Sequence, residues 1–243
     1  MPLSERLTAV ASMVTPGLNV ADVGCDHGYL AIYLVKKGIS PRVIAMDINR
    51  GPLQRADENI REAGFDGKID VRLSNGLEML ERGEVSSIVM AGMGGPLMTD
   101  IIDRGIDICD GARELILQPQ SEIEEVRHYL EDHGYRIISE DIVLEDGKYY
   151  PMMKAVHGEM YLENDVYYRY GKILLKEEHP ILRAYLRYER EMLRGIRDEL
   201  LASERTPKVN ERLKELERDI AIVNEAIGMS EKINPMTIER ELK

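Results

Sequence analysis

Apolar and polar positions follow two different rhythms along this chain, and the change between them lies near residue 160. Before it, short β-branched runs alternate with amphipathic stretches. The runs predict buried strands over residues 20–24, 42–47, 68–74, 86–92 and 114–119. The stretches predict helices over residues 29–38, 52–64 and 121–134. Strands that alternate with helices indicate right-handed βαβ units and a parallel sheet.

Glycine and proline mark the ends of the predicted helices. Gly38, Gly64 and Gly134 stand where a helix C-cap favours a residue that tolerates positive φ. Pro52 suits the first turn of a helix, where its missing N–H has no partner to lose. These positions support the predicted helix boundaries.

A hairpin is expected after the last of these helices. Strand patterns over residues 135–145 and 148–156 flank Asp146-Gly147, which is a strong signal for a two-residue turn. We therefore predict an α/β fold, a doubly wound sheet that ends in an antiparallel hairpin. Class I methyltransferases have this Rossmann-like arrangement, whereas nicotinamide-binding domains usually lack the terminal hairpin.

Beyond residue 160 the strand patterns stop and two long helical patterns follow, over residues 181–204 and 209–228, with Pro207 between them. Their apolar residues recur at heptad-like spacing and form a seam. The seam consists of Leu186, Leu193 and Leu200 in the first pattern and Val209, Leu213, Leu216, Ile220, Val223 and Ile227 in the second. The short connection predicts an antiparallel, coiled-coil-like pair. We therefore expect a domain over residues 1–157 and a helical domain over residues 158–243.

Composition fits a folded chain of this kind. The 243 residues are 44% hydrophobic and 31% charged, which permits a core and disfavours disorder. No apolar run approaches a bilayer span, and the N-terminus lacks a secretory signal. Cys25 and Cys109 are isolated and lack metal-ligand spacing, so we expect no disulfide, no metal site and a reducing, cytoplasmic location. No obligate protein partner is evident.

The charge is unevenly distributed. A net charge of −12 argues against a nucleic-acid partner at first sight. Residues 161–243 are nearly neutral at −1, however, and residues 1–160 carry the remaining −11. The acidity therefore belongs to the N-terminal domain.

A glycine-rich loop follows the first predicted strand, in the segment Asp22-Val23-Gly24-Cys25-Asp26-His27-Gly28. Its glycines permit a sharp turn and the close approach of a ligand. Asp47, at the end of the second strand, can accept hydrogen bonds from both hydroxyls of a ribose and would repel a cofactor phosphate. The structural alternative for Asp47 is an N-cap or turn aspartate.

Two further motifs end the third and fourth strands. The Asn75 amide, within Ser74-Asn75-Gly76, can pair with a purine edge, although a plain turn is the alternative. Residues 91–96 contain three glycines, more than one tight turn requires, which favours the close approach of a ligand. We expect cofactor contacts from Asp22, Gly24, Cys25, Asp26, Gly28, Asp47, Ile48, Asn75, Gly76, Gly92, Met93 and Gly94.

Asp26 departs from the usual loop pattern, in which a glycine stands at its position. A carboxylate here is suited to a sulfonium cofactor, and it would hold a target amine or accept its proton as the catalytic group. The alternative is that Asp26 caps the following helix. For His27, a structural hydrogen bond is the alternative to substrate contact.

The whole chain resembles the bacterial tRNA (adenine(22)-N1)-methyltransferases, the TrmK family. The resemblance covers nearly all of residues 1–230 and rests on LSERL, ADVGCDHGYL, AGMGG, LILQPQ, EDGKYY and YGKILLKEEHPILRAYL. It implies a class I methyltransferase domain followed by a helical pair. It also implies methyl transfer from S-adenosylmethionine to N1 of adenosine 22 in tRNA. The family's functional Ser/Cys-Asp-His segment falls on Cys25, Asp26 and His27, while Asn75 and Gln120 depart from the family's usual aspartate and asparagine.

The resemblance directs attention to how a base would enter. N1 lies on the Watson–Crick edge of adenine, so the base must be unpaired or flipped. We expect His27, Tyr29, Gln118, Pro119 and Gln120 to frame the substrate pocket with the loop over Gly92–Gly95.

Affinity for tRNA needs a second source, because the N-terminal domain is acidic. We expect phosphate contacts from a basic stripe at 4-3-4-3 spacing, formed by Arg183, Arg187, Arg190, Arg194 and Arg197. The alternative is a solvated face balanced by nearby glutamates.

Three rival functions stay open at this point. A class I methyltransferase could act on another RNA, a protein or a small molecule. A nonenzymatic adaptor with a decayed cofactor domain would not bind S-adenosylmethionine. A dehydrogenase is disfavoured by the terminal hairpin and by the lack of a clear hydride-transfer constellation.

Overall fold

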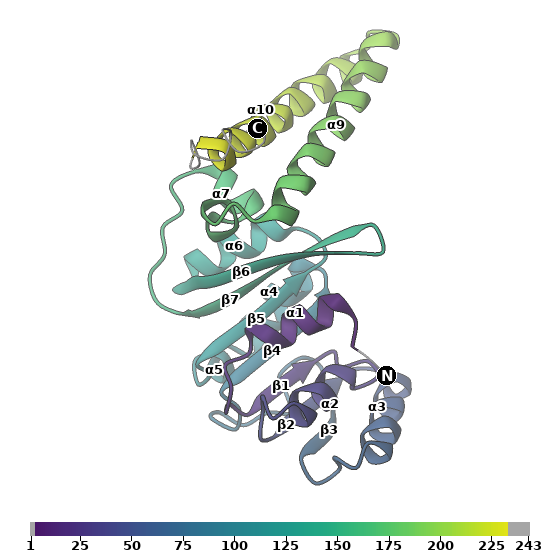
Figure 1. Ribbon diagram of the computed structural model, residues 1–243, viewed down its shortest axis with the longest axis vertical. Coiled ribbons are helices and arrows are strands. Elements are labelled where there is room, and N and C mark those ends of the chain that lie inside the picture. The colour runs from purple at the N-terminus through teal and green to yellow at the C-terminus, as the bar shows by residue number, and fades with distance from the viewer. Residues whose placement is uncertain (1–2, 233–243) are drawn as a thin grey trace, which may run out of the picture. The chain divides into compact units, whose positions relative to one another are not determined.

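The computed structural model describes residues 3–232, and the part of the predicted helical domain over residues 233–243 lies outside this range. The chain forms two compact units, Met1–Tyr161 and Leu162–Lys243 (Figure 1). No helix within residues 3–232 is long and apolar enough to cross a membrane. In the same range, no group of three or more His, Cys, Asp or Glu side chains is placed to hold a metal ion.

The first unit contains a seven-stranded sheet in the order β3-β2-β1-β4-β5-β7-β6. The strands are β1 (Val20–Val23), β2 (Val43–Asp47), β3 (Ile69–Leu73), β4 (Ser87–Met93), β5 (Glu114–Pro119), β6 (Tyr135–Glu145) and β7 (Lys148–His157). The first five strands are parallel, and β7 is antiparallel to both β5 and β6. The predicted doubly wound sheet with a terminal antiparallel hairpin is confirmed.

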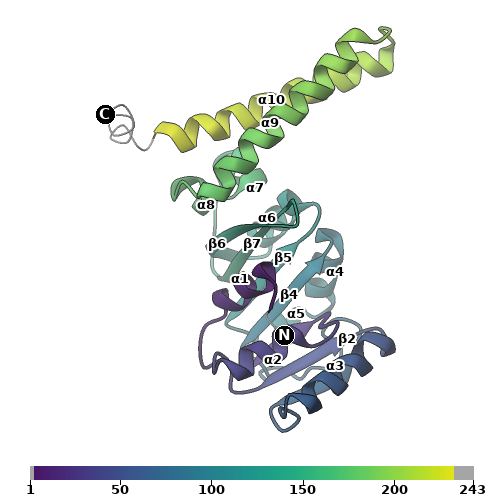
Figure 2. The same ribbon diagram turned by 45° about the vertical axis from the view of Figure 1, so that its right-hand side comes forward.

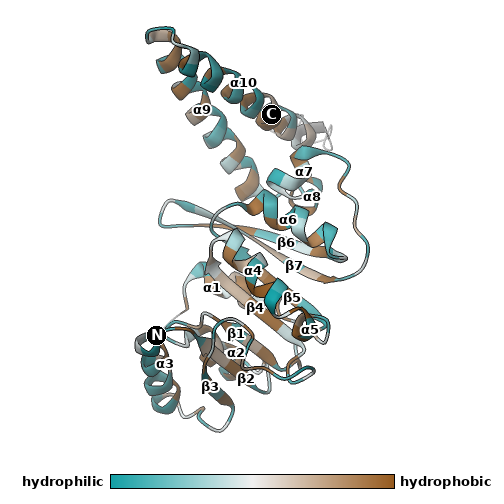
Figure 3. Ribbon diagram, turned by 180° about the vertical axis from the view of Figure 1, so that it is seen from behind, coloured by the Kyte–Doolittle hydropathy of each residue, from teal (hydrophilic) through white to brown (hydrophobic). Residues whose placement is uncertain are grey.

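Helices cover both faces of this sheet because successive strand residues point to opposite sides. They are α1 (Glu5–Met13), α2 (Tyr29–Lys36), α3 (Arg50–Glu62), α4 (Gly95–Arg104), α5 (Ile106–Cys109) and α6 (Ile123–Asp132). On one face Ala45 packs with residues of α1, α2 and α3, and on the other Met46 packs with residues of α4, α5 and α6. In Figure 3 the strands that lie between these layers are largely brown, which marks apolar residues.

Glycines and turn residues in the sequence correctly predicted several ends of helices and strands. Asp146 and Gly147 both have positive φ (49° and 73°), and Glu145 pairs with Lys148, as a two-residue hairpin turn requires. Gly38, Gly64 and Gly134 have φ of 69°, 74° and 73° at the predicted helix ends. The helix expected over 121–134 is shorter, because Glu122 takes a left-handed conformation and α6 begins after it.

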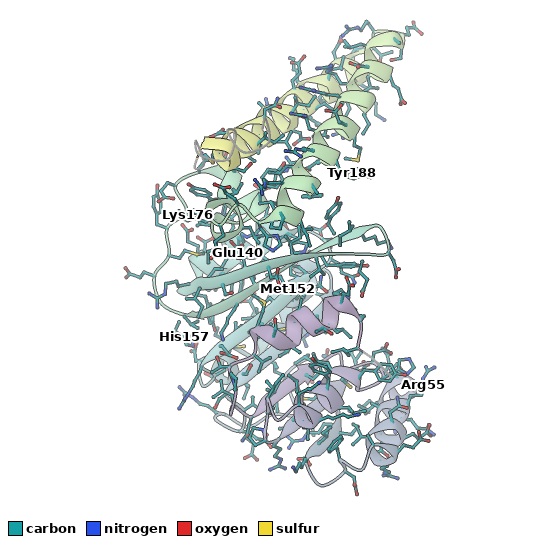
Figure 4. All side chains as sticks on the ribbon, viewed as in Figure 1. Arg55, Glu140, Met152, His157, Lys176 and Tyr188 are labelled. Atoms are coloured by element: carbon teal, nitrogen blue, oxygen red, sulfur yellow. The ribbon has the colours of Figure 1, made fainter. Side chains whose placement is uncertain are left out.

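Helix α1 is an element that the hydrophobic pattern did not reveal. The Ser4 side chain accepts a hydrogen bond from the Leu7 N–H and caps the start of α1. Val10 packs in one buried cluster with Met152 of β7, which Figure 4 labels beside α1. Helices α4 and α5, and α7 and α8 of the second unit, also add to the predicted set.

The second unit is helical, with α7 (Asp165–Tyr170), α8 (Lys172–Lys176), α9 (Pro180–Ala202) and α10 (Pro207–Lys232). Helices α9 and α10 lie side by side and run in opposite directions (Figures 1 and 2). The predicted seam lies between them: it buries Leu186, Leu193, Leu213, Leu216, Ile220 and Val223, while Leu200, Val209 and Ile227 are half-buried.

One buried charge joins three helices of the second unit. Glu189 of α9 accepts hydrogen bonds from Arg169 (2.9 Å) and from the Tyr170 hydroxyl (2.8 Å), both on α7. Arg169 also donates to Asp219 of α10 (2.7 Å). A buried carboxylate with these partners ties α7 to the α9–α10 pair.

Candidate active site

The loop between β1 and α2 is held tightly against β2. The backbone N–H groups of Gly24 and Cys25 both donate to the Met46 carbonyl, at 2.8 and 2.9 Å. Gly24, Asp26 and Gly28 have φ of 74°, 47° and 72°, so three left-handed residues alternate within one short turn. Glycine tolerates this conformation at little cost, whereas it is uncommon for a residue with a Cβ atom such as Asp26.

Both glycines of this loop also permit close packing. A Cβ atom on residue 28 would lie 3.2 Å from Cβ of Ala56 on α3, and one on residue 24 would overlap the end of the Met93 side chain. A larger residue would therefore be strained at both positions; it would displace the Met93 methyl group at residue 24 and crowd Ala56 at residue 28. The sharp turn places the loop beside the carboxyl end of β4.

A cavity of about 300 Å³ opens at this edge of the sheet. It is lined by Arg6, Leu7, Asp22, Gly24, Cys25, Asp26, His27, Tyr29, Leu30, Ala91, Gly92 and Gln120. Eight of these residues were expected at the site from the sequence. Because the cavity lies at the carboxyl ends of β1 and β4, it occupies the position at which open α/β sheets bind ligands.

Asp22 contributes a buried carboxylate to this cavity. Its Oδ2 atom has no hydrogen-bond partner among the residues that the structure describes. Burial raises the pKa of Asp22 to about 7; the Ala31 N–H lowers this value and the nearby Asp47 raises it. A buried, unpaired carboxylate oxygen is costly unless a ligand supplies a donor or a positive charge.

Cys25 lines the same cavity, but its thiol is not activated for reaction. Burial is the main reason that the pKa of the Cys25 thiol lies far above its usual range, and the Asp22 and Asp47 carboxylates raise it further. The thiol therefore stays protonated at neutral pH, so Cys25 is not an activated nucleophile.

Asp26 points its carboxylate toward solvent at the cavity, with 70% of the side chain exposed. The N-cap of α2 is Gly28, and no side chain caps this helix, so the helix-cap alternative for Asp26 is not observed. Asp26 Oδ1 lies 3.6 Å from His27 Nε2, and the His27 ring stacks on Tyr29 with centroids 5.5 Å apart. An exposed carboxylate and an aromatic pair thus face one opening.

The N-terminal helix contributes two residues that were missed from the sequence, Arg6 and Leu7. The Arg6 guanidinium donates from Nη1 to Gln118 Oε1 (2.7 Å) and lies over the Tyr150 ring. Glu145 of β6 accepts from the Glu5 backbone N–H (2.6 Å), which anchors the start of α1. The Ser4 N-cap before Leu7, Val10 and Ala11 was the available signal for this helix.

The predicted substrate residues of β5 divide into two groups. The Gln118 side chain is fully buried; it accepts from Arg6 and donates to the Pro119 carbonyl (3.0 Å). Gln118 and Pro119 do not line the cavity. Gln120 is exposed and does line it, while its backbone N–H donates to the Met93 carbonyl (2.8 Å). Gln118 therefore holds the cavity-lining residue Arg6 in place, and neither Gln118 nor Pro119 is exposed to the cavity.

Four predicted cofactor residues are not among those that line the cavity: Asp47, Ile48, Asn75 and Gly76. Asp47 and Leu73 pair across β2 and β3, so Asn75 follows at the neighbouring strand end. Asp47 Oδ1 accepts from the Asn49 N–H (2.8 Å), and Asn75 donates to Glu78 (2.9 Å). Ile48 is 60% exposed and forms an apolar surface next to them.

Comparison with known proteins identifies the chain's relatives. Residues 3–153 match a family model described as a methyltransferase domain. The tRNA (adenine(22)-N(1))-methyltransferase of Bacillus subtilis strain 168 is 32% identical over 232 residues, which covers 93% of this chain and 98% of the relative. The chain belongs to the TrmK family.

Two solved structures agree with the TrmK assignment. The Bacillus subtilis M1A22 tRNA methyltransferase TrmK has a TM-score of 0.83 at 32% identity, with 93% of this chain and 99% of that chain covered. A Streptococcus pneumoniae structure in complex with S-adenosyl-L-methionine has a TM-score of 0.83 at 36% identity, with 93% and 100% covered.

The basic stripe of this TrmK-family chain is largely paired with its own carboxylates. Arg183 lies 3.7 Å from Glu178, and Arg197 lies 2.8 Å from Asp198. Arg190 and Arg194 both approach Glu191, at 3.2 and 3.3 Å. Arg187 is exposed and forms no ion pair with a carboxylate within residues 3–232. Such surface pairs are weak, so a phosphate would compete for these arginines at little cost.

Proposed function

We propose that this chain is an S-adenosylmethionine-dependent tRNA (adenine(22)-N1)-methyltransferase. The extent of the match to the Bacillus subtilis enzyme, 93% of this chain, carries the proposal. A match of that extent includes the helical unit as well as the methyltransferase unit. A shared cofactor fold alone would leave the substrate open, whereas a shared second unit favours the same substrate.

The residues present fit S-adenosylmethionine. The Asp22 Oδ2 atom would accept from the cofactor's ammonium group, and the backbone of Gly24 and Gly92 lines the cavity that would receive it. Asp47 would hold the ribose hydroxyls, with Ile48 and Asn75 beside the adenine. When bound, the cofactor supplies a methyl group that its sulfonium sulfur already activates for transfer.

Asp26 is the group that we assign to catalysis. Its exposed carboxylate would accept a hydrogen bond from the exocyclic amine of the target adenine and so align the N1 lone pair. The same negative charge would stabilise the positive charge that develops on the ring during methylation. No proton has to leave N1 before attack, so alignment and the exclusion of water are the main demands.

The surroundings of Asp26 would receive a flipped base. Tyr29 and His27 already stack on each other, and Tyr29 would offer an aromatic edge to the adenine. Gln120 would contact its polar edge, while the buried Gln118 and Pro119 hold the backbone of that segment in place. The adenine must leave any base pair to expose N1.

The second unit would supply affinity for the tRNA backbone. Its arginine stripe on α9 would exchange weak surface ion pairs for phosphate contacts and so compensate for the acidic first unit. A tRNA substrate also favours a cytoplasmic location for the chain.

The direct test uses methyl-labelled S-adenosylmethionine and an unmodified tRNA transcript with adenosine at position 22. The matched control is the same transcript with guanosine at that position. We expect label in the first transcript alone, mapped to N1 of nucleotide 22. Label at another nucleotide would contradict position 22 as the methylated site. Label in a protein or small molecule alone would favour a class I methyltransferase that acts on that substrate. Absence of cofactor binding would favour the adaptor.

A further inference from the structure

Arg6 is a cation placed at an otherwise acidic cavity. Apart from the His27 imidazole, it is the one basic side chain among the cavity-lining residues, which also include Asp22 and Asp26. A Cβ atom on residue 92 would lie 3.3 Å from Arg6 Nη1, so the guanidinium lies directly beside Gly92. Positive and negative groups therefore face the same space of about 300 Å³.

The Arg6 guanidinium has no anionic partner within residues 3–232. Its contacts are the neutral Gln118 amide oxygen at 2.7 Å and the face of the Tyr150 ring at 5.5 Å. These two contacts fix the side chain while several of its five N–H donors stay available. A half-buried, immobilised cation without a carboxylate is an arrangement that favours an anionic ligand group.

The position of Arg6 depends on long-range contacts rather than on a flexible tail. Glu145 of the β6–β7 hairpin accepts from the Glu5 backbone N–H, and Ser4 caps the same helix end. Gln118, which receives the Arg6 hydrogen bond, is itself fully buried. The guanidinium is therefore preorganised, so little side-chain entropy remains to be lost on binding.

Two unsatisfied groups of opposite sign thus meet at one cavity. Within residues 3–232, the buried Asp22 Oδ2 has no hydrogen-bond partner and the Arg6 guanidinium contacts no carboxylate. A ligand that satisfies both carries a positive and a negative group within one cavity of about 300 Å³. A free α-amino acid group, with its ammonium and carboxylate on one carbon, has this property.

We propose that Arg6 binds the carboxylate of the amino-acid part of S-adenosylmethionine, which makes the N-terminal helix α1 a component of the cofactor site. This inference rests on the proposed function, because that function supplies the cofactor. It adds a cofactor-binding residue from outside the glycine-rich strand ends.

The test compares two ligands that differ in the carboxylate alone: S-adenosylmethionine and decarboxylated S-adenosylmethionine. Titration calorimetry measures the Kd of each for the full chain and for Arg6→Met. Loss of charge-assisted hydrogen bonds should weaken S-adenosylmethionine binding by about ten- to a hundredfold. Binding of the decarboxylated ligand should change by less than about threefold, since it has no carboxylate to lose.

Two variants and the wild-type protein complete the experiment. Arg6→Lys should restore part of the affinity for S-adenosylmethionine, because it keeps the charge but not the planar fork. Arg113→Met, an exposed position at the opposite end of β5, should bind both ligands as the wild type does. The wild type should itself prefer the ligand with the carboxylate, which tests the proposal even if Arg6→Met lowers the Tm.

The outcomes separate this inference from the proposed function. Equal weakening of both ligands would assign Arg6 a structural role and overturn the inference. Unchanged S-adenosylmethionine binding with a raised KM for tRNA would also overturn it, in favour of a contact to the RNA. In both cases the wild type would still methylate tRNA, so the proposed function would stand. A wild-type chain that binds neither ligand would refute both.

Discussion

The terminal methyl group of Met93 lies in the space that a Cβ atom on residue 24 would occupy. The contact joins the loop after β1 to the end of β4, and both segments contribute residues to the cavity lining. Gly24 also has a φ of 74°, a conformation that L side chains rarely adopt. Gly24 is thus constrained twice, once by its backbone and once by its neighbour.

Gly24→Ala should weaken S-adenosylmethionine binding by at least about tenfold, because Met93 must move and the cavity-lining loop must shift with it. The matched control is Gly38→Ala, with a φ of 69° and no atom within 4 Å of the added Cβ. Both variants should lose about 1–2 kcal/mol of stability from the left-handed backbone. Thermal unfolding and calorimetric titration measure the two effects, and equal ligand affinities in the two variants would contradict this account.

Removing the Asp26 carboxylate should abolish most turnover but spare cofactor binding. Asp26→Gly is the informative variant, because glycine suits the φ of 47° that alanine tolerates poorly. We expect kcat to fall by about a hundredfold or more, as for other charge-stabilising groups, with the Kd for S-adenosylmethionine within about threefold. Single-turnover methylation of tRNA measures the step. Near-wild-type turnover in Asp26→Gly would remove the catalytic assignment.

Asp22 should make stability depend on pH. Its pKa is raised to about 7 by burial, above the unfolded value of 3.8, so the folded state binds the proton more tightly. The stabilising proton is fully present below pH 3.8 and is lost as the pH rises to about 7. Asp22→Asn should therefore stabilise the unliganded chain by about 2–4 kcal/mol at pH 8 and have little effect near pH 4.

Denaturant unfolding at several pH values checks this prediction. The control is Asp57→Asn, a partly exposed residue that pairs with Arg61 one helical turn away and should show no such trend. The same Asp22→Asn variant should bind S-adenosylmethionine more weakly, since the amide cannot supply a negative charge. A variant that is destabilised at pH 8 would show that the buried carboxylate has a partner in solution.

The arginine stripe makes a prediction about salt. Reversing Arg183 and Arg187 to glutamate should weaken tRNA binding and reduce the slope of log K against log salt by up to about 2. The matched control reverses Arg212 and Lys214, which are exposed on α10. Both pairs remove the same charge, so a nonspecific effect would appear in both. An unchanged slope in the Arg183/Arg187 variant would leave the stripe a solvated face.

Much of the fold follows from short-range pattern. The predicted strand over residues 114–119 coincides with β5, and the turn at Asp146-Gly147 takes the expected backbone conformation. A continuous apolar run predicts a strand that is buried on both faces, and an Asp-Gly pair predicts a turn with positive φ. Both signals lie within a few consecutive residues, so the sequence alone reveals them. The ordered strand ends also brought Gly24, Asp26 and Gly92 to one cavity, as the parallel sheet requires.

The rest of the site depends on contacts that no local pattern records. Arg6 reaches Gln118 across 112 positions of the chain, and the β6 residue Glu145 accepts the hydrogen bond that holds the start of α1. The sequence by itself determined which loops lie at the cavity edge, since strand order and glycine conformation are encoded locally. Only the tertiary structure decided which charges remain unpaired there. Within residues 3–232, Asp22 is buried without a partner for Oδ2 and Arg6 contacts an amide oxygen in place of a carboxylate, because distant segments pack around them.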